Sequence, residues 1–303
     1  MNPVSTQSSR RTVYLVDGTY ELFRHYYGAP PRKAVDGTEV GAIAGLLRSL
    51  IMLVRSRTAQ YIACAFDHVI ESFRNDLFPG YKSSEGVDKV LLAQFPGAEA
   101  AVRALGMVAW PMIEFEADDA LATAASRWES DSRVEKIILC SPDKDLCQCV
   151  RGDRVVCWNR RTDQILDENG VIDRYGIAPE LIPDWLSLVG DSADGIPGLA
   201  GWGPRTASLV LSHYGKIENI PLDGDCWEVS VRGASRLAAR LQAEYEQVLL
   251  YRHLATLRTD VDLSEDLDDL FWSPELANQF PEFCRWLGDP SLAESVEALD
   301  NRA

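Results

Sequence analysis

The sequence predicts an α/β fold in which helices flank a mostly parallel sheet, followed by a helical region. Up to about residue 175, short apolar runs rich in Val, Ile and Tyr are each followed by a longer helical pattern. This alternation is typical of a parallel sheet. From there to about residue 260 the strand signals stop, and helical segments punctuated by Pro and Gly take over.

Four apolar runs are the expected strands, at residues 13–16, 61–66, 108–110 and 137–140. The stretches between them, such as residues 40–55, carry apolar residues at helical spacing and are expected to be helices. Each helix then connects two parallel strands, as a crossover requires.

The composition is that of an ordinary globular protein, because 46% of the 303 residues are hydrophobic and 9% are aromatic. No apolar run approaches the roughly 18 residues of a membrane span. Residues 1–11 are polar, so we expect no signal peptide, no membrane partner and a cytoplasmic location. The seven cysteines are an odd number, and Cys147 and Cys149 lack a second pair at zinc-like spacing. We therefore expect reduced thiols.

The net charge of −16 at first argues against nucleic acid, because DNA binding relies on Lys and Arg that neutralise phosphates. The charge is unevenly distributed, however. Residues 261–303 hold eleven Asp or Glu against Arg285 and Arg302, which predicts a solvated acidic face. Nine further carboxylates belong to the candidate metal site described next. The remainder of the chain is compatible with a DNA partner.

Three of the four expected strands run directly into an aspartate, at Asp17, Asp67 and Asp143. Ligands of an open parallel sheet bind outside the carboxyl ends of its strands, so these side chains are expected to converge. The segment Glu116-Ala117-Asp118-Asp119 adds three carboxylates at the start of an alanine-rich helix. Acids in a first helical turn also serve as caps and complement the helix dipole, and that structural alternative stays open.

Three more aspartates complete the set. Asp145 forms a pair with Asp143, and Asp191 forms a pair with Asp194 in a glycine-bounded turn. Carboxylates crowded into one crevice repel one another, and divalent cations relieve that repulsion. Oxygen ligands without His or Cys favour Mg²⁺ or Mn²⁺. Two such ions about 4 Å apart are the usual arrangement for phosphodiester hydrolysis. The predicted metal ligands are Asp17, Asp67, Glu116, Asp118, Asp119, Asp143, Asp145, Asp191 and Asp194.

A glycine-rich hairpin follows the last of these acids and opens a helix. Glycines let the backbone approach a phosphate closely, and the N–H groups of the following helix start bind anions. A tight structural loop is the alternative, but the position directly after Asp194 favours a DNA-backbone site. The expected DNA-binding residues are Gly198, Gly201, Gly203, Arg205 and Thr206.

These residues resemble the 5′ nucleases, a family that includes flap endonucleases and the 5′ nuclease domain of bacterial DNA polymerase I. The resemblance covers roughly residues 12 to 215, in family order. It rests on Val16-Asp17-Gly18, Phe66-Asp67, Phe73-Arg74, Tyr81-Lys82, Glu116-Ala117-Asp118-Asp119, Asp143-Lys144-Asp145-Leu146 and the stretch from Gly190-Asp191 through Asp194-Gly195 to Thr206-Ala207.

The resemblance implies a structure-specific 5′-3′ exonuclease and flap endonuclease that uses two metal ions. It also implies a PIN-like nuclease core at 12–175 with a helical arch near 72–100, a helix-three-turn-helix DNA-binding region at 176–260, and an acidic segment at 261–303. Asp17, Asp67, Glu116 and Asp118 should hold one ion, and Asp119 should lie beside them. The other ion should be held by Asp143, Asp145, Asp191 and Asp194.

The same resemblance assigns catalytic positive charge to Lys82, Arg24 and Arg74. The family's arginine three residues after the lysine is missing, because Tyr81-Lys82 is followed by Ser83-Ser84-Glu85. Lys89 is the candidate substitute, since a residue seven positions along a helix lies on the same face. Ser83, Ser84 and Gly86 are poor helix formers, so this segment is expected to become helical only around a threaded 5′ strand.

Three other functions are compatible with parts of the pattern. A Toprim or phosphatase-type fold also gathers acids at strand ends, but neither predicts the glycine hairpin. A non-enzymatic protein that binds branched DNA would be favoured by the loss of several acids, and all nine are present. An enzyme acting on RNA primers fits the same residues. We expect a free-standing monomer acting on DNA with a 5′ flap, nick, gap or free 5′ end.

Overall fold

The computed structural model of the chain describes residues 11–300 and divides into two compact units. Unit 1 comprises the chain up to Val69, Glu85–Ser141 and the residues from Thr259 onward. Unit 2 comprises Ile70–Ser84 and Pro142–Arg258. The nine predicted metal ligands are therefore distributed over both units.

Unit 1 is built on four parallel strands in the order β3-β2-β1-β4. Asp17 pairs with Ala65 in register, and Val16 with Cys140, so the carboxyl ends of these strands lie together. The buried runs of Val, Ile, Leu and Ala within them fit strands covered on both faces. All four predicted strands are confirmed, as β1 (Arg11–Asp17), β2 (Tyr61–Asp67), β3 (Val108–Met112) and β4 (Val134–Cys140).

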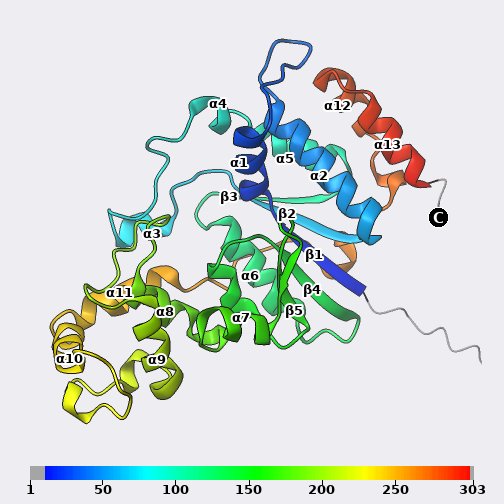
Figure 1. Cartoon of the computed structure of the whole chain (residues 1–303). Helices are drawn as coiled ribbons and strands as arrows, with labels where there is room; N and C mark the ends of the chain where they lie inside the picture. Colours follow the sequence, from blue (N-terminus) through cyan, green and yellow to red (C-terminus); the bar gives the residue numbers. More distant parts are fainter. Residues whose placement is uncertain (1–10, 301–303) are drawn as a thin grey trace, which may run out of the picture. The chain divides into compact units, whose positions relative to one another are not determined.

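Helices cover both faces of this sheet (Figure 1). On one face lie α1 (Gly18–Gly28), α2 (Gly41–Arg57) and α5 (Phe95–Ala104), and on the other lies α6 (Ala117–Trp128). The helix predicted at residues 40–55 corresponds to α2, whose Leu46, Leu47 and Leu50 are fully buried. Each such leucine contributes about 2 kcal/mol relative to an exposed one. A short helix, α4 (Lys89–Leu92), precedes α5.

The acidic C-terminal segment belongs to unit 1 and is only partly the solvated face that its charge predicts. Its apolar side chains Leu267, Phe280 and Leu287 are buried. Asp289 pairs with Arg32 at 2.7 Å and Arg48 at 2.6 Å, so part of the acidity is neutralised within unit 1. Its elements are η5 (Leu267–Leu270), η6 (Pro274–Leu276), α12 (Phe280–Leu287) and α13 (Ser291–Asp300), of which α13 packs against α2 (Figure 1).

Unit 2 is mainly helical, and its pair of antiparallel strands, β5 (Val155–Asn159) with β6 (Gln164–Leu166), was not expected from the sequence. The predicted helical region after residue 175 is confirmed, because no strand lies in the described residues 176–258. Its core is formed where α8 packs against α11 and α9. The helices of unit 2 are α3 (Phe73–Leu77), η1 (Asp145–Cys149), α7 (Glu168–Tyr175), η2 (Pro179–Leu181), α8 (Ile182–Val189), α9 (Pro204–Tyr214), η3 (Ile217–Asn219), η4 (Gly224–Cys226), α10 (Ala234–Ala243) and α11 (Tyr245–Ala255).

The cysteines and the helices bear on two features of the composition. All seven cysteines lie among residues 11–300, and none of them forms a disulfide bond there. Among residues 11–300, no helix has the length and apolar character that a membrane crossing requires.

Candidate metal centre

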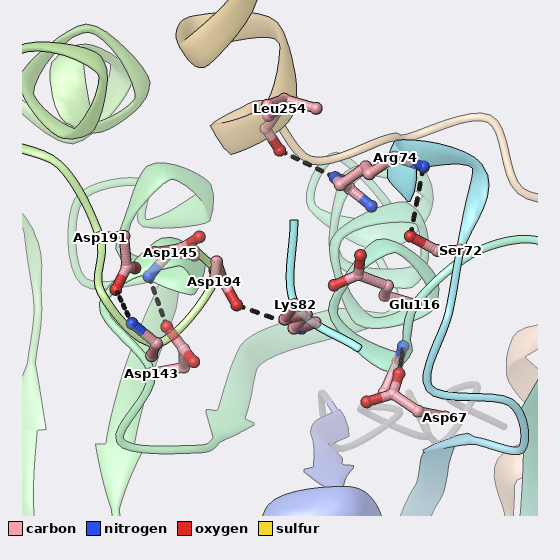
Figure 2. A network of polar contacts seen from close by, with 12 residues as sticks. Asp67, Ser72, Arg74, Lys82, Glu116, Asp143, Asp145, Asp191, Asp194 and Leu254 are labelled. Carbon is pink, nitrogen blue, oxygen red and sulfur yellow. Dashed lines mark hydrogen bonds and ion pairs between the residues drawn. The ribbon is translucent and has the colours of Figure 1, made fainter. Parts of the chain in front are cut away.

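Four aspartates of unit 2 form one carboxylate group, shown close up in Figure 2. Asp145, Asp191 and Asp194 each place a carboxylate oxygen within 4.8 Å of the other two. Asp143 joins them, because its Oδ1 accepts a hydrogen bond of 2.9 Å from the backbone N–H of Asp145. We call these four residues the unit 2 carboxylates. They are the four that the sequence assigns to one ion.

Two local structures hold the unit 2 carboxylates in place. Asp145 begins η1, where the amide of Gln148 donates to the carbonyls of Asp145 at 2.9 Å and of Ala255 at 3.0 Å. Asp191 follows the end of α8 and closes a turn with Ile196 through backbone bonds of 2.7 and 2.8 Å. Asp194 lies within that turn, so both pairs are fixed by the backbone around them.

Gly195 shows how tightly this turn is packed. Its φ of +74° is a conformation that glycine adopts readily. A Cβ at this position would lie 2.1 Å from the carbonyl oxygen of Gly80, so only glycine fits. The neighbouring N–H of Lys82 donates to the carbonyl of Asp194 at 3.0 Å. The turn and residues 80–82 are therefore joined within unit 2.

The chemistry of the unit 2 carboxylates fits a divalent cation. Burial, together with the nearby charges of Asp143 and Asp194, raises the pKa of Asp145 well above its ordinary value. Its Oδ1 is buried and receives no hydrogen bond from any residue in the range 11–300. A buried carboxylate oxygen without a donor is costly, and a cation with oxygen preference supplies the missing interaction.

Two lysines supply positive charge to this group. Lys144 forms an ion pair with Asp191. The Nζ of Lys82 lies 3.4 Å from Oδ1 of Asp194, and Figure 2 shows these two residues side by side. Burial works against the charged form of Lys144, but Asp145 and Asp191 outweigh it and raise the pKa of the ammonium. The sequence predicted a role for Lys82 and missed one for Lys144. The position of Lys144 between Asp143 and Asp145 was the sequence feature that could have indicated this role.

In unit 1, two aspartates lie at strand ends as predicted. Asp17 ends β1 and caps α1, with Oδ1 accepting from the N–H of Tyr20 at 2.8 Å. Its Oδ2 accepts from the hydroxyl of Ser141 at 2.8 Å, a contact that the sequence analysis missed although Ser141 directly follows β4. Asp67 ends β2, and its Oδ1 accepts from the N–H of Ala117 at 2.6 Å. That bond places Asp67 at the start of α6.

The three acids at the start of α6 divide into different roles. Glu116 is the N-cap and is buried, and its backbone N–H donates to Oδ2 of Asp119 at 3.0 Å. Asp119 is fully buried and completes this capping box. It therefore has the helix-capping role that was the alternative to metal binding. Asp118 lies in the first turn and is half-buried. We call Asp17, Asp67, Glu116, Asp118 and Asp119 the unit 1 carboxylates.

The expected catalytic role of Arg74 needs correction. The side chain is 1% exposed, its Nε donates to the carbonyl of Leu254 at 2.8 Å, and an Nη donates to that of Thr256 at 3.3 Å (Figure 2). Arg74 therefore fastens α3 to the end of α11 within unit 2. A guanidinium committed to backbone carbonyls in the interior has a structural role.

Arg24 and Lys89, the other predicted basic residues, both lie in unit 1. Arg24 pairs with the buried Glu21 at 2.5 Å and donates to the hydroxyl of Ser49 at 3.2 Å. Lys89 is exposed at the first position of α4. Residues 78–88 contain no helix, and Gly86 has a φ of +85°, so the helical spacing by which Lys89 was chosen is wrong for this structure.

The glycine hairpin lies where the sequence places it, directly before a helix of unit 2. Gly203 is the N-cap of α9 and has no side chain with which to cap it, while Arg205 is exposed in the first turn. Trp202 is buried, and its indole N–H donates to the carbonyl of Leu237 in α10 at 3.4 Å. The hairpin is thus anchored by one aromatic side chain and leaves the start of α9 at the surface.

Comparison with protein-family models gives two adjoining matches. Residues 12–176 match a 5′-3′ exonuclease N-terminal, resolvase-like domain. Residues 177–278 match a 5′-3′ exonuclease C-terminal SAM fold. The two matches adjoin at residues 176 and 177.

Individual proteins agree with these models. The chain is 32% identical to a 5′-3′ exonuclease of Aquifex aeolicus, over 97% of this chain and 98% of the relative. It is 33% identical to DNA polymerase I of Pseudomonas aeruginosa, over 97% of this chain and 33% of the relative. The chain therefore spans about a third of the length of such polymerases.

Solved structures share the fold at lower identity. T5 5′-exonuclease with bound zinc ions is similar at 16% identity and a TM-score of 0.64, covering 96% of this chain and 99% of that one. The catalytic core of Rad2 in complex with a DNA substrate is similar at 16% identity and a TM-score of 0.61, covering 96% and 92%.

Proposed function

Because the chain belongs to the family of 5′-3′ exonucleases and flap endonucleases, which are metal-dependent nucleases, we propose that it cleaves phosphodiester bonds near the 5′ ends of branched or frayed DNA. The proposed substrates are DNA with a 5′ flap, a nick, a gap or a free 5′ end. The similarity to the T5 D15 flap endonuclease and to the Rad2 catalytic core, each in complex with DNA, supports this substrate class.

One observation carries the proposal, namely the convergence of Asp145, Asp191 and Asp194 within 4.8 Å with only oxygen atoms as ligands. Such a set favours hard cations, so we propose Mg²⁺ or Mn²⁺ as the physiological ions. When bound, two such ions supply an activated water and stabilise charge on the scissile phosphate. We assign one ion to the unit 2 carboxylates and the other to Asp17, Asp67, Glu116 and Asp118 of unit 1.

The other residues of the proposed site position these ligands and the substrate. Asp119 holds the N–H of Glu116 and thereby fixes the start of α6. Lys82 is held by the bond from its N–H to Asp194, with its ammonium near that carboxylate. A fixed ammonium of this kind stabilises negative charge as it develops on a phosphate. Arg24 contributes more weakly in this proposal, because Glu21 neutralises it.

The hairpin of Gly198, Gly201 and Gly203 with Arg205 and Thr206 is the proposed contact to the DNA backbone. The start of α9 carries backbone N–H groups and the positive end of a helix dipole, both of which favour phosphate. Contacts of this type carry no base information, so binding should depend on salt and not on sequence. Seven free thiols are compatible with the cytoplasm, where we propose that the protein acts as a monomer on DNA or on RNA-primed 5′ ends.

An assay of substrate geometry and metal dependence tests the proposal. End-labelled flap, nicked, gapped and single-stranded DNA would be incubated side by side with Mg²⁺, with Mn²⁺ and with EDTA. We expect cleavage near the 5′ end of branched substrates with either ion and none with EDTA. Cleavage that persists after exhaustive chelation, or binding of branched DNA without any cleavage, would overturn the nuclease assignment.

A further inference from the structure

Lys144 lies inside the unit 2 carboxylates and competes for the same oxygens that a cation would take. Its ammonium forms the ion pair with Oδ2 of Asp191 and lies 4.0 Å from Oδ1 of Asp145. Only about a third of the side chain is exposed. Lys144 therefore lines the proposed metal site.

The two oxygens of Asp191 show why this competition is direct. Oδ1 accepts the N–H of Ala193 at 3.0 Å, which is a bond within the turn that shapes the carboxylate group. Oδ2 accepts from Lys144. Oδ2 lies outside the bonds of the turn and is therefore the oxygen of Asp191 more open to a cation, and the ammonium already contacts it.

The second oxygen near the ammonium is the one with no hydrogen bond. Oδ1 of Asp145 is buried and receives no donor from the described part of the chain, and Lys144 lies at the outer limit of an ion pair with it. One lysine thus neutralises Asp191 by contact and Asp145 at longer range. A divalent cation at short distance from both oxygens would neutralise them more completely.

Building on the proposed function, we propose that Lys144 is an internal counter-ion that a divalent cation displaces from Asp191 when it binds the unit 2 carboxylates. In the metal-free protein the ammonium offsets the repulsion between Asp145 and Asp191. As the cation binds, it must break that ion pair. Lys144 therefore stabilises the metal-free fold and weakens metal affinity at the same time.

The test combines Lys144→Met, Lys144→Arg and, as a matched control, Lys216→Met. Methionine keeps much of the length of the side chain and removes the charge, whereas arginine keeps the charge. Lys216 is an exposed lysine of the same unit, at the start of η3. For each protein, Mn²⁺ binding would be measured by calorimetric titration, and the thermal midpoint would be measured in EDTA and in saturating Mn²⁺.

We expect Lys144→Met to bind Mn²⁺ roughly fivefold to tenfold more tightly than the wild type, because a repelling charge is removed from the site. Its midpoint in EDTA should fall, so the stabilisation by Mn²⁺ should be larger. Lys144→Arg and Lys216→Met should both bind Mn²⁺ within about twofold of the wild type.

Two results would overturn this role of Lys144 and leave the nuclease proposal standing, namely unchanged or weaker Mn²⁺ binding by a folded Lys144→Met. Should that variant fail to fold in EDTA, its refolding by Mn²⁺ at concentrations that saturate the wild type would support the proposal, and a failure to refold would contradict it. If the wild type binds no Mn²⁺, the metal site itself fails, and the counter-ion role fails with it.

Discussion

The unit 1 carboxylates and the unit 2 carboxylates are held by different local structures. In unit 1, Asp17 and Asp67 end strands and accept hydrogen bonds from neutral donors, including the N–H groups of Tyr20 and Ala117. In unit 2, Asp191 and Asp194 lie on a glycine-shaped turn and face the side chains of Lys144 and Lys82. In unit 2 these lysine contacts are added to the backbone hydrogen bonds that Asp143 and Asp191 accept.

This difference has consequences for stability and for metal binding. Hydrogen bonds from backbone N–H groups orient a carboxylate whether or not a cation is present. On the proposed role of Lys144, its ion pair is rearranged when a cation arrives, which couples metal binding to stability. We therefore expect the unit 2 carboxylates to dominate the response of the protein to metal removal, while the proposed mechanism needs both groups for cleavage.

The largest expected effect is shared by Asp67→Asn in unit 1 and Asp145→Asn in unit 2. Each should lower the cleavage rate by about 10³-fold or more, because each removes a ligand charge from a proposed ion site. The two variants should differ in EDTA, where only Asp145→Asn gains stability by removing repulsion from Asp143 and Asp194. Single-turnover cleavage and calorimetric melting measure the two effects.

The matched control is Asp153→Asn, which changes the same charge at an exposed position of unit 2. It should leave both the rate and the melting temperature close to the wild-type values. Turnover near the wild-type rate in either ligand variant would contradict the metal assignment. Equal destabilisation of both variants in EDTA would contradict the difference drawn between the two units.

The next largest effect is expected for Lys82→Ala, which should slow single-turnover cleavage at saturating DNA by roughly 10²-fold. The substitution removes the ammonium but keeps the backbone bonds of residue 82 to Asp194 and Asn75, so the fold should persist. Loss of DNA affinity at an unchanged cleavage rate would instead make Lys82 a binding residue.

Gly198→Ala should damage the turn that carries Asp191 and leave unit 1 intact. The φ of residue 198 is +69°, and a Cβ would lie 2.4 Å from the nitrogen of Gly190 and 2.5 Å from the carbonyl carbon of Val189. Such overpacking costs about 2 kcal/mol or more. Gly152→Ala is the control, since its φ is also positive, at +53°, but nothing lies within 4 Å. It should cost only about 1 kcal/mol.

Chemical denaturation with and without Mn²⁺ would distinguish these two glycine variants. Gly198→Ala should also lose Mn²⁺ binding at the unit 2 carboxylates, whereas Gly152→Ala should keep it. Equal costs for the two would show that backbone conformation alone, and not the close approach of two chain segments, makes residue 198 a glycine.

A smaller effect is expected from pH. In the metal-free protein the pKa of Asp145 is raised by burial and by Asp143 and Asp194. A carboxyl with a raised folded-state pKa contributes stability below its unfolded value and loses that contribution as pH rises through its folded value. The melting temperature of Asp145→Asn minus that of the wild type, in EDTA, should therefore increase as pH rises. Saturating Mn²⁺ should abolish this trend.

Taking the difference between two proteins removes the contribution of groups outside the site. Glu218, whose pKa is lowered to about 2 by its bond with Arg252, changes the stability of both proteins equally. A difference that stays constant with pH would show that Asp145 is not protonated in the metal-free fold.

The sequence predicted those features that depend on local pattern. Strand-end aspartates such as Asp17 and Asp67 are foreseeable because parallel strands end at one edge. Long-range pairing was not foreseeable. Lys144 meets Asp191 across 47 residues, and Arg74 meets the carbonyl of Leu254 across 180. Which partner a long basic side chain finds is decided by tertiary packing, so neither the interior position of Arg74, to which the resemblance assigns catalysis, nor the contact of Lys144 was foreseeable.

The smallest effect is expected for Lys89→Ala. The case for Lys89 as a catalytic residue rested on a helix running from Lys82, and residues 82–88 form none. Lys89 is exposed at the start of α4, where solvent and salt screen its charge. Its loss should therefore change the single-turnover rate at saturating DNA by less than about threefold.

Comparing the cleavage rates of Lys89→Ala and Lys82→Ala on the same flap substrate tests whether residues 82–88 keep this structure when DNA binds or reorganise around it. Both changes remove one positive charge, so salt dependence of binding should shift similarly. If Lys89→Ala slows the chemical step by tenfold or more, the segment must reorganise on the 5′ strand and place Lys89 near the phosphate. A small effect would leave Lys82 as the residue of this segment that acts on the chemical step.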